Sequence, residues 1–183
     1  MIIGLTGTKG SGKGEVANFL KMMGFNYLSL SDMVRAEAKK TYSSPTARQL
    51  SDIGNRLRQE NGPGILAKIA AKKIEKGNYV VDGIRNPSEV AELRRLDKFY
   101  LIAVDANQKL RYERTRVRSR GDCPDSLEEF LEIDSRDLGK GEKKHGQRVM
   151  DTMKIADAKI INDGTLCELR ESLEQILLDF LKS

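Results

Sequence analysis

Near its N-terminus the chain reads GTKGSGKG over residues 7–14, and the expected fold follows from this octapeptide. It matches the pattern G-x-x-x-x-G-K in every fixed position, follows the apolar run IIGLT at 2–6 and precedes a helical pattern. Glycines let such a loop curl, so that its backbone N–H groups converge on phosphate oxygens. The helix N-terminus adds a partial positive charge, and Lys13 adds a full one. The octapeptide therefore predicts a loop that binds nucleotide phosphates; a glycine-rich turn without a ligand is the alternative.

The residues after Lys13 depart from the usual form of this pattern. A Ser or Thr commonly follows the lysine and touches Mg²⁺ through its hydroxyl, whereas this chain has Gly14 and then Glu15. Mg²⁺ keeps several waters in most sites, so a missing hydroxyl does not exclude the metal. An acid here suits the helix dipole but repels phosphate, and we expect its side chain to point away. The residues expected to bind the nucleotide in this segment are Gly7, Thr8, Lys9, Gly10, Ser11, Gly12, Lys13, Gly14 and Glu15.

Short apolar runs alternate with longer helical patterns along the rest of the chain. Runs such as YVV and YLIAV do not alternate polar with apolar residues, which is typical of parallel strands buried on both faces. Repeated strand–helix–strand units predict a three-layer α/β/α fold with a five-stranded parallel sheet, in which ligands bind at the carboxyl ends of the strands. The expected strands are 2–6, 27–30, 79–82, 100–104 and 159–162. The expected helices are 14–22, 32–40, 51–60, 64–75, 87–96, 108–118, 126–137, 146–156 and 166–181.

Two helix starts carry a capping signal. Ser31 is the expected N-cap of the helix at 32–40. Asn86 is the expected N-cap of the helix at 87–96, where Pro87 occupies the first helical position.

Composition limits the class of protein. The 183 residues fit one domain, and a net charge of +5 suits a partner that carries phosphates. Basic residues are interleaved with acidic ones, which makes nucleic acid an unlikely partner. No apolar run is long enough for a membrane span, and the chain begins directly with a core strand, so we expect no signal peptide and no membrane partner. Cys123 and Cys167 match no metal-ligand spacing, and free thiols favour a cytoplasmic location.

Three segments carry a resemblance to a known family. Gly12-Lys13-Gly14 resembles the adenylate-kinase branch of the P-loop nucleoside monophosphate kinase superfamily, although that branch has Thr where this chain has Glu15. SLSDMVR at 29–35 resembles the segment that holds the acceptor monophosphate, and VDGIR at 81–85 is similar to a D-G-F-P-R stretch with one residue fewer. The resemblance implies that Asp82 holds the metal through water. It assigns Ser31, Asp32, Arg35, Gly83 and Arg85 to the acceptor, with Arg35 and Arg85 on its phosphate.

The insertion at about 32–76 is where such kinases bind the base or sugar of the acceptor. Arg56 and Arg58 lie in it, and we expect Arg56 to contact the acceptor; exposed helix arginines are the alternative. A second arginine-rich stretch resembles a short lid at about 117–145, whose closure excludes water and neutralises charge on the transferred group. A solvated helix face is the alternative for that stretch. The catalytic set is then Lys13, Asp82, Arg116, Arg120 and Arg136.

The turn INDG at 161–164 resembles the one near the donor base in these kinases and in dephospho-coenzyme A kinases, which implies contacts from Asn162 and Gly164. The overall likeness is greatest to uncharacterised adenylate-kinase-related and dephospho-coenzyme-A-kinase-like proteins. We therefore expect an ATP- and Mg²⁺-dependent kinase acting on a small phosphate-bearing acceptor, most simply a (deoxy)nucleoside monophosphate. Two alternatives stay open: a kinase of the dephospho-coenzyme A type, whose acceptor is an alcohol, and a nucleotide-binding regulatory module with little transfer activity.

Overall fold

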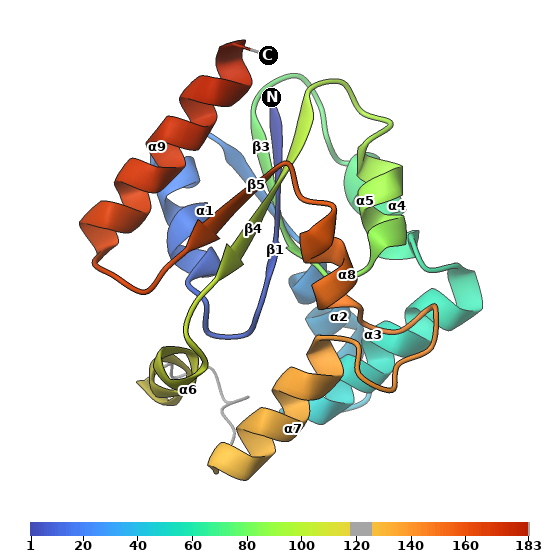
Figure 1. The fold of residues 1–183 in the computed structure, drawn as a ribbon. Coiled ribbons are helices and arrows are strands. Elements are labelled where there is room, and N and C mark those ends of the chain that lie inside the picture. Colours follow the sequence, from blue (N-terminus) through green and yellow to red (C-terminus); the bar gives the residue numbers. More distant parts are fainter. Residues whose placement is uncertain (118–125, 183) are drawn as a thin grey trace.

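The computed structural model describes residues 1–117 and 126–182, and within them five strands form one parallel sheet (Figure 1). The order β2-β3-β1-β4-β5 puts β1 at the centre, paired with β3 on one side and β4 on the other. Helices cover both faces, so the predicted three-layer α/β fold is confirmed. The strands are β1 (Ile2–Gly7), β2 (Asn26–Ser29), β3 (Tyr79–Ile84), β4 (Phe99–Asp105) and β5 (Ala158–Ile161).

Two apolar cores lie on opposite faces of the sheet. Because successive side chains of a strand point to opposite faces, Ile2 joins one core and Ile3 the other, and both are buried. The helices α1 (Lys13–Met22) and α9 (Leu166–Lys182) cover the Ile3 face. The helices on the Ile2 core are α2 (Leu30–Ala38), α3 (Ala47–Asn61), α4 (Ile65–Ala71) and α5 (Pro87–Leu93). The remaining helices are α6 (Gln108–Val117), α7 (Leu127–Asp137) and α8 (Val149–Lys154).

The start of α2 differs from the prediction. The helix begins two residues early, and its N-cap is Ser29, whose Oγ accepts a hydrogen bond from the Asp32 amide at 3.0 Å. Ser31 therefore lies inside the first turn instead of capping it. The spacing explains the choice, because a cap hydroxyl reaches the amide two or three residues ahead and Ser29 can already do so. Asn86 caps α5 as predicted, with Pro87 in the first turn.

The helix predicted over 146–156 is shorter, because tertiary contacts hold the residues before it outside the helix. The side-chain amide of Asn86 donates to the carbonyls of Lys144 and Gly146 at 3.1 and 2.8 Å, and the Arg148 amide donates to the Arg85 carbonyl at 2.7 Å. These bonds tie the segment to the end of β3, and α8 begins only at Val149.

The helix predicted over 64–75 is also shorter and ends at Ala71. Beyond it the Glu75 amide meets the Tyr79 hydroxyl at 3.3 Å, where the chain turns into β3.

Helices α3 and α7 lie side by side beyond the carboxyl ends of the strands (Figure 1). Arg136 on α7 donates to Asp52 on α3 at 2.6 Å, and the side chain of Gln147 donates to Ser51 at 2.7 Å. The segment expected to be the acceptor insertion, at about 32–76, is therefore in contact with the segment expected to be the lid, at about 117–145. In the part of the chain that the structure describes, no helix has the length and apolar character needed to cross a lipid bilayer.

Candidate phosphate-transfer site

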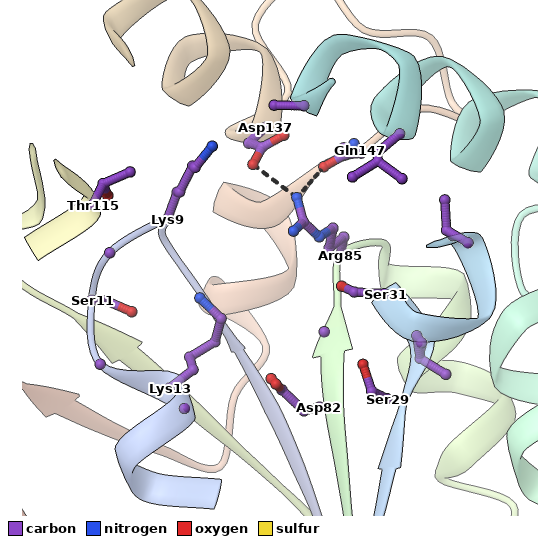
Figure 2. A pocket seen from close by; sticks show the side chains of 18 of the residues that line it. Lys9, Ser11, Lys13, Ser29, Ser31, Asp82, Arg85, Thr115, Asp137 and Gln147 are labelled. Atoms are coloured by element: carbon purple, nitrogen blue, oxygen red, sulfur yellow. Dashed lines mark hydrogen bonds and ion pairs between the residues drawn. The ribbon is translucent and has the colours of Figure 1, made fainter. Parts of the chain in front are cut away.

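A cavity of about 630 Å³ opens at the carboxyl ends of the central strands (Figure 2). The phosphate loop and the start of α1 form one wall, and residues of α2, α3 and α7 form the opposite one. Figure 2 shows Asp82, near the end of β3, between the two walls, and Gly83 also lines the cavity. This is the edge of the sheet at which parallel α/β folds bind ligands, and it gathers segments that are far apart in the sequence.

Close packing makes two glycines of the phosphate loop necessary. Gly10 has a φ of +78°, and a Cβ built on it would lie 2.4 Å from the Arg111 carbonyl oxygen. Gly12, the N-cap of α1, has a φ of +97°, and its Cβ would lie 2.2 Å from the side-chain nitrogen of Asn162. Any larger residue would strain the backbone and displace its neighbour.

Lys13 reaches back along the concave side of the loop. Its Nζ donates to the carbonyl oxygens of Gly7 and Thr8 at 2.8 and 2.7 Å. Figure 2 shows its ammonium group inside the cavity, between the loop and Asp82. Lys9 also lines the cavity, and Figure 2 shows its side chain extending away from Lys13, toward Asp137. Two lysines therefore lie on the wall that the phosphate loop forms, and Lys13 lies where a helix N-terminus would attract nucleotide phosphates.

Side chains from other segments of the chain brace the loop. Asn162 is buried, and its side chain donates to the Ser11 carbonyl at 2.9 Å, while Arg114 donates to the Asn162 carbonyl at 2.8 Å. The Thr8 hydroxyl donates to Asp105 at 2.8 Å. The amide of Asn162 thus holds the loop, whereas its contact with a donor base stays a prediction. Gly164 and Glu15 are exposed and line the cavity, while Gly7 and Thr8 support the loop without lining it.

Two buried polar atoms in this cavity have no hydrogen-bond partner among the described residues: Asp82 Oδ1 and Ser11 Oγ. The other carboxylate oxygen of Asp82 accepts from the Tyr27 hydroxyl at 3.2 Å. Burial and the Asp82 charge raise the pKa of Tyr27 to about 12, so it stays a neutral donor. A carboxylate oxygen held toward the phosphate region suits the outer shell of a hydrated Mg²⁺, which retains most of its waters. The Asp82 carboxylate therefore fits the expected Mg²⁺, held through water.

Arg85 lies at the far side of the cavity with two partners. Its Nη1 donates to Asp137 at 2.8 Å and to the side-chain oxygen of Gln147 at 2.6 Å (Figure 2). Burial lowers the pKa of the guanidinium, but the carboxylates of Asp137, Asp82 and Glu89 outweigh burial and raise it above its ordinary value. Arg85 is therefore a fixed cation at the end of the cavity opposite the phosphate loop.

Arg58, rather than Arg56, lines the acceptor side of the cavity. Arg58 is 2% exposed, and its Nε donates to Glu89 at 2.8 Å. Arg56, two residues away on α3, is exposed and does not line the cavity. Arg35 lines it beside Ser31, while Asp32, which accepts from Arg35 at 3.4 Å, is exposed and lies outside the wall.

The predicted lid arginines do not gather in the cavity within the described residues. Arg116 is exposed and lies over the Tyr112 ring at 5.9 Å. Arg136 binds Asp52 and Glu142, and it lines a separate cavity of about 60 Å³. Arg114 does line the main cavity. The catalytic roles predicted for Arg116 and Arg136 thus have no support from their positions in this structure. Arg120 lies outside the described residues, as do Arg118 and Cys123.

Several residues of the site were missed in the sequence analysis. The motif Asn86-Pro87-Ser88-Glu89 is a capping-box signature, and it could have indicated Glu89 as the acidic partner at the third helical position. Local sequence gives no comparable signal for Gln147 or Asp137, which reach Arg85 from 62 and 52 residues away. Tyr27 belonged to a predicted strand, but only the pairing of β2 with β3 brings it to Asp82.

Comparison with known protein families identifies close relatives in sequence. A family profile described as an AAA domain matches residues 6–131. A UPF0200 protein of Pyrococcus horikoshii is 35% identical over 191 residues, covering 100% of this chain and 99% of its own. A UPF0200 protein of Methanothermobacter thermautotrophicus is 33% identical over 181 residues, covering 97% and 89%.

Solved structures share the fold at lower sequence identity. The crystal structure of TT1252 from Thermus thermophilus has a TM-score of 0.62 and 22% identity, covering 98% of this chain and 97% of its own. Shikimate kinase from Acinetobacter baumannii, in complex with shikimate, has a TM-score of 0.59 and 16% identity, covering 97% and 93%. At these identities the likeness establishes a P-loop kinase-like fold and nothing finer.

Proposed function

The chain belongs to the UPF0200 family and has a P-loop kinase-like domain, and from this premise we propose that it is an ATP- and Mg²⁺-dependent phosphotransferase. The proposed acceptor is a small molecule that carries a phosphate, most simply a (deoxy)nucleoside monophosphate. One observation carries the proposal: a single cavity has the phosphate loop with Lys13 on one side and the guanidinium of Arg85 on the other, with Asp82 between them.

This arrangement supplies what phosphoryl transfer needs from a protein. Catalysis of this reaction depends mainly on positioning and on neutralising charge, with little proton chemistry. In the proposal the loop amides and Lys13 hold the β- and γ-phosphates of the donor. Arg35 and Arg85 bind the acceptor phosphate, since a planar guanidinium binds phosphate with two parallel hydrogen bonds.

Asp82 has a supporting role in the proposal. Its buried Oδ1 faces the cavity, and Tyr27 fixes the other carboxylate oxygen. These oxygens would hold water of a bound Mg²⁺, whose charge would neutralise the donor phosphates. We further propose that the segment at about 117–145 is a lid over this cavity and that 32–76 is the acceptor insertion of a single domain.

A second candidate is a kinase whose acceptor is an alcohol, as in kinases of the dephospho-coenzyme A type. Charge on the acceptor side favours it: Arg58 is already paired with Glu89, and Arg85 with Asp137. These pairs neutralise Arg58 and Arg85, which suits a hydroxyl at the reacting end of the acceptor better than a phosphate dianion at that end.

Coupled assays with ATP and a panel of acceptors would test the proposal and separate the candidates. The panel holds the (deoxy)nucleoside monophosphates, dephospho-coenzyme A and shikimate, the ligand of the Acinetobacter baumannii enzyme. Replacing Lys13 by alanine should lower turnover by at least about a hundredfold, the usual cost of losing one group that stabilises transition-state charge. Lys73→Ala removes an exposed lysine after α4 and should leave turnover unchanged.

Two results would contradict the kinase assignment. One is an absence of turnover with every acceptor. The other is calorimetric binding of ATP without transfer, which would favour a nucleotide-binding regulatory module.

A further inference from the structure

Helix α7 carries two buried carboxylates one turn apart, Asp134 and Asp137, which are 1% and 7% exposed. Each holds a different arginine. Asp134 accepts two hydrogen bonds from Arg111, one of them 2.8 Å from Nη2 to Oδ2, and Asp137 accepts from Arg85 at 2.8 Å. Residues three apart on a helix share one face, so both carboxylates face the rest of the protein.

Arg111 connects α7 to the phosphate loop. It is 5% exposed, and its guanidinium donates to the Lys9 carbonyl at 3.2 Å and to the Ala106 carbonyl at 3.1 Å. Its own carbonyl is the atom against which Gly10 packs. Arg111 therefore contacts the phosphate loop on one side and, through Asp134, α7 on the other.

Arg85 connects α7 to the other end of the cavity. Its guanidinium has Asp137 and Gln147 as partners, and its backbone carbonyl accepts from the Arg148 amide at 2.7 Å. The position of this cation therefore depends on where α7 lies.

We propose that α7 is a bridge that couples the occupancy of the phosphate loop to the position of Arg85, with Asp134 and Asp137 as its two positioning residues. This inference rests on the proposed function, because it takes the loop as the donor site and Arg85 as a contact of the acceptor. Filling the loop would then pre-position the acceptor arginine. Binding the donor before the acceptor arginine is in place is useful for a kinase, because water can attack the donor phosphate when the acceptor is mispositioned.

Four variants isolate the bridge. Asp134→Asn and Asp137→Asn each remove one charge and keep the shape of the side chain. Adding Gln147→Glu to Asp137→Asn returns a carboxylate to Arg85 from the other side, where Gln147 already lies 2.6 Å from Nη1. Glu128→Gln, on the exposed first turn of α7, is the matched control.

Hydrogen exchange with and without adenylyl imidodiphosphate and Mg²⁺ reads the coupling without any turnover. In the wild type we expect slower exchange in the phosphate loop and, at a distance, about fivefold slower exchange in peptides that cover 83–90 and 146–152. Asp134→Asn and Asp137→Asn should keep the protection of the loop and lose the distant protection. The variant that adds Gln147→Glu should still lack it, because position 147 lies outside α7 and pairs the charge of Arg85 without restoring the link to the helix, and Glu128→Gln should match the wild type.

The outcomes separate the inference from the proposed function. Distant protection that persists in both Asp134→Asn and Asp137→Asn, or that the added Gln147→Glu restores, overturns the bridge while protection of the loop upholds nucleotide binding. Absence of protection in the wild-type loop overturns the proposed function and the bridge with it. If Asp134→Asn does not fold, the comparison of Asp137→Asn with the form that adds Gln147→Glu decides.

For any acceptor that turns over, steady-state kinetics give a second reading. Asp137→Asn should raise the KM for the acceptor about tenfold and leave the KM for ATP within about threefold, and the added Gln147→Glu should leave the KM for the acceptor raised. If Asp137 only paired the charge of Arg85, a carboxylate at position 147 would reverse the change, and a purely structural loss would change both KM values.

Discussion

Glu89 is the group whose removal should damage this site most, although it does not line the cavity. It is fully buried and accepts three hydrogen bonds: from Arg58 Nε at 2.8 Å, from the Arg85 amide at 2.8 Å and from the Asn86 amide at 3.1 Å. It therefore neutralises one arginine, fixes the backbone of another and completes the cap of α5. The change Glu89→Ala removes all three functions together.

The loss of stability expected for Glu89→Ala comes mainly from Arg58. Its side chain is 3% exposed, so loss of Glu89 leaves a buried cation without its carboxylate. Breaking one side of a buried ion pair costs about 3–5 kcal/mol of unfolding free energy. At roughly 2–4 °C per kcal/mol for a chain of this length, Tm should fall by roughly 6–20 °C.

Arg58→Met should destabilise the protein less than Glu89→Ala does, and this difference between the two variants makes the prediction specific. Arg58→Met leaves Glu89 with both of its backbone donors, so the carboxylate stays partly compensated. In Glu89→Ala/Arg58→Met no buried charge is left unpaired, and this double variant should recover most of the loss. Urea unfolding of the four proteins gives the coupling energy of the pair, which should exceed about 1.5 kcal/mol. Glu132→Ala, on the exposed face of α7, is the control and should lie within about 0.5 kcal/mol of the wild type.

The reasoning fails if Glu89→Ala unfolds within 1 kcal/mol of the wild type by this order-of-magnitude scale. It also fails if the double variant is as unstable as the sum of the single variants. Either result would mean that Arg58 finds another partner or solvent when the carboxylate is gone.

Three further predictions concern the centre of the cavity. Tyr27 should ionise near pH 12, and Tyr27→Phe should remove that transition from an ultraviolet titration of the tyrosines. Because the pKa in the folded protein lies above the ordinary value of 10.0, the stability that the neutral hydroxyl contributes is complete below pH 10. It is lost as the pH rises toward about 12. A wild-type protein with all tyrosines ionising near pH 10 would contradict this. Gly83→Ala should destabilise the fold by about 1–3 kcal/mol in urea unfolding, because the φ of +82° is strained for alanine and the new Cβ would lie 2.6 Å from Ser31 Oγ; an unchanged midpoint would refute it. In calorimetry, Asp82→Asn should bind ATP without Mg²⁺ as tightly as the wild type does, but should lose most of the increase in ATP affinity that Mg²⁺ gives. An equal increase in affinity in both proteins would exclude a metal role for this carboxylate.

The local pattern of residues was enough to predict the framework of the site. The octapeptide at 7–14, set between an apolar run and a helix, indicated the phosphate loop, and the five strands were predicted to within two residues at each end. These features depend on neighbours in the chain: glycines for tight turns, β-branched runs for buried strands, and Asn86-Pro87 for a helix start. Physical rules that act over a few residues apply to them directly.

Tertiary structure alone decided which arginines face the cavity and what holds them. Arg56 and Arg58 are alike in sequence, yet the rotation of α3 against the sheet buries only Arg58, beside Glu89. Arg85 was expected at the site, but its partners come from 52 and 62 residues further along the chain. A charged side chain is buried only where a partner compensates its desolvation, and that partner can lie anywhere in the sequence. The sequence thus predicts by itself a phosphate-binding loop near its N-terminus, whereas folding determines how the opposite wall of the cavity is charged.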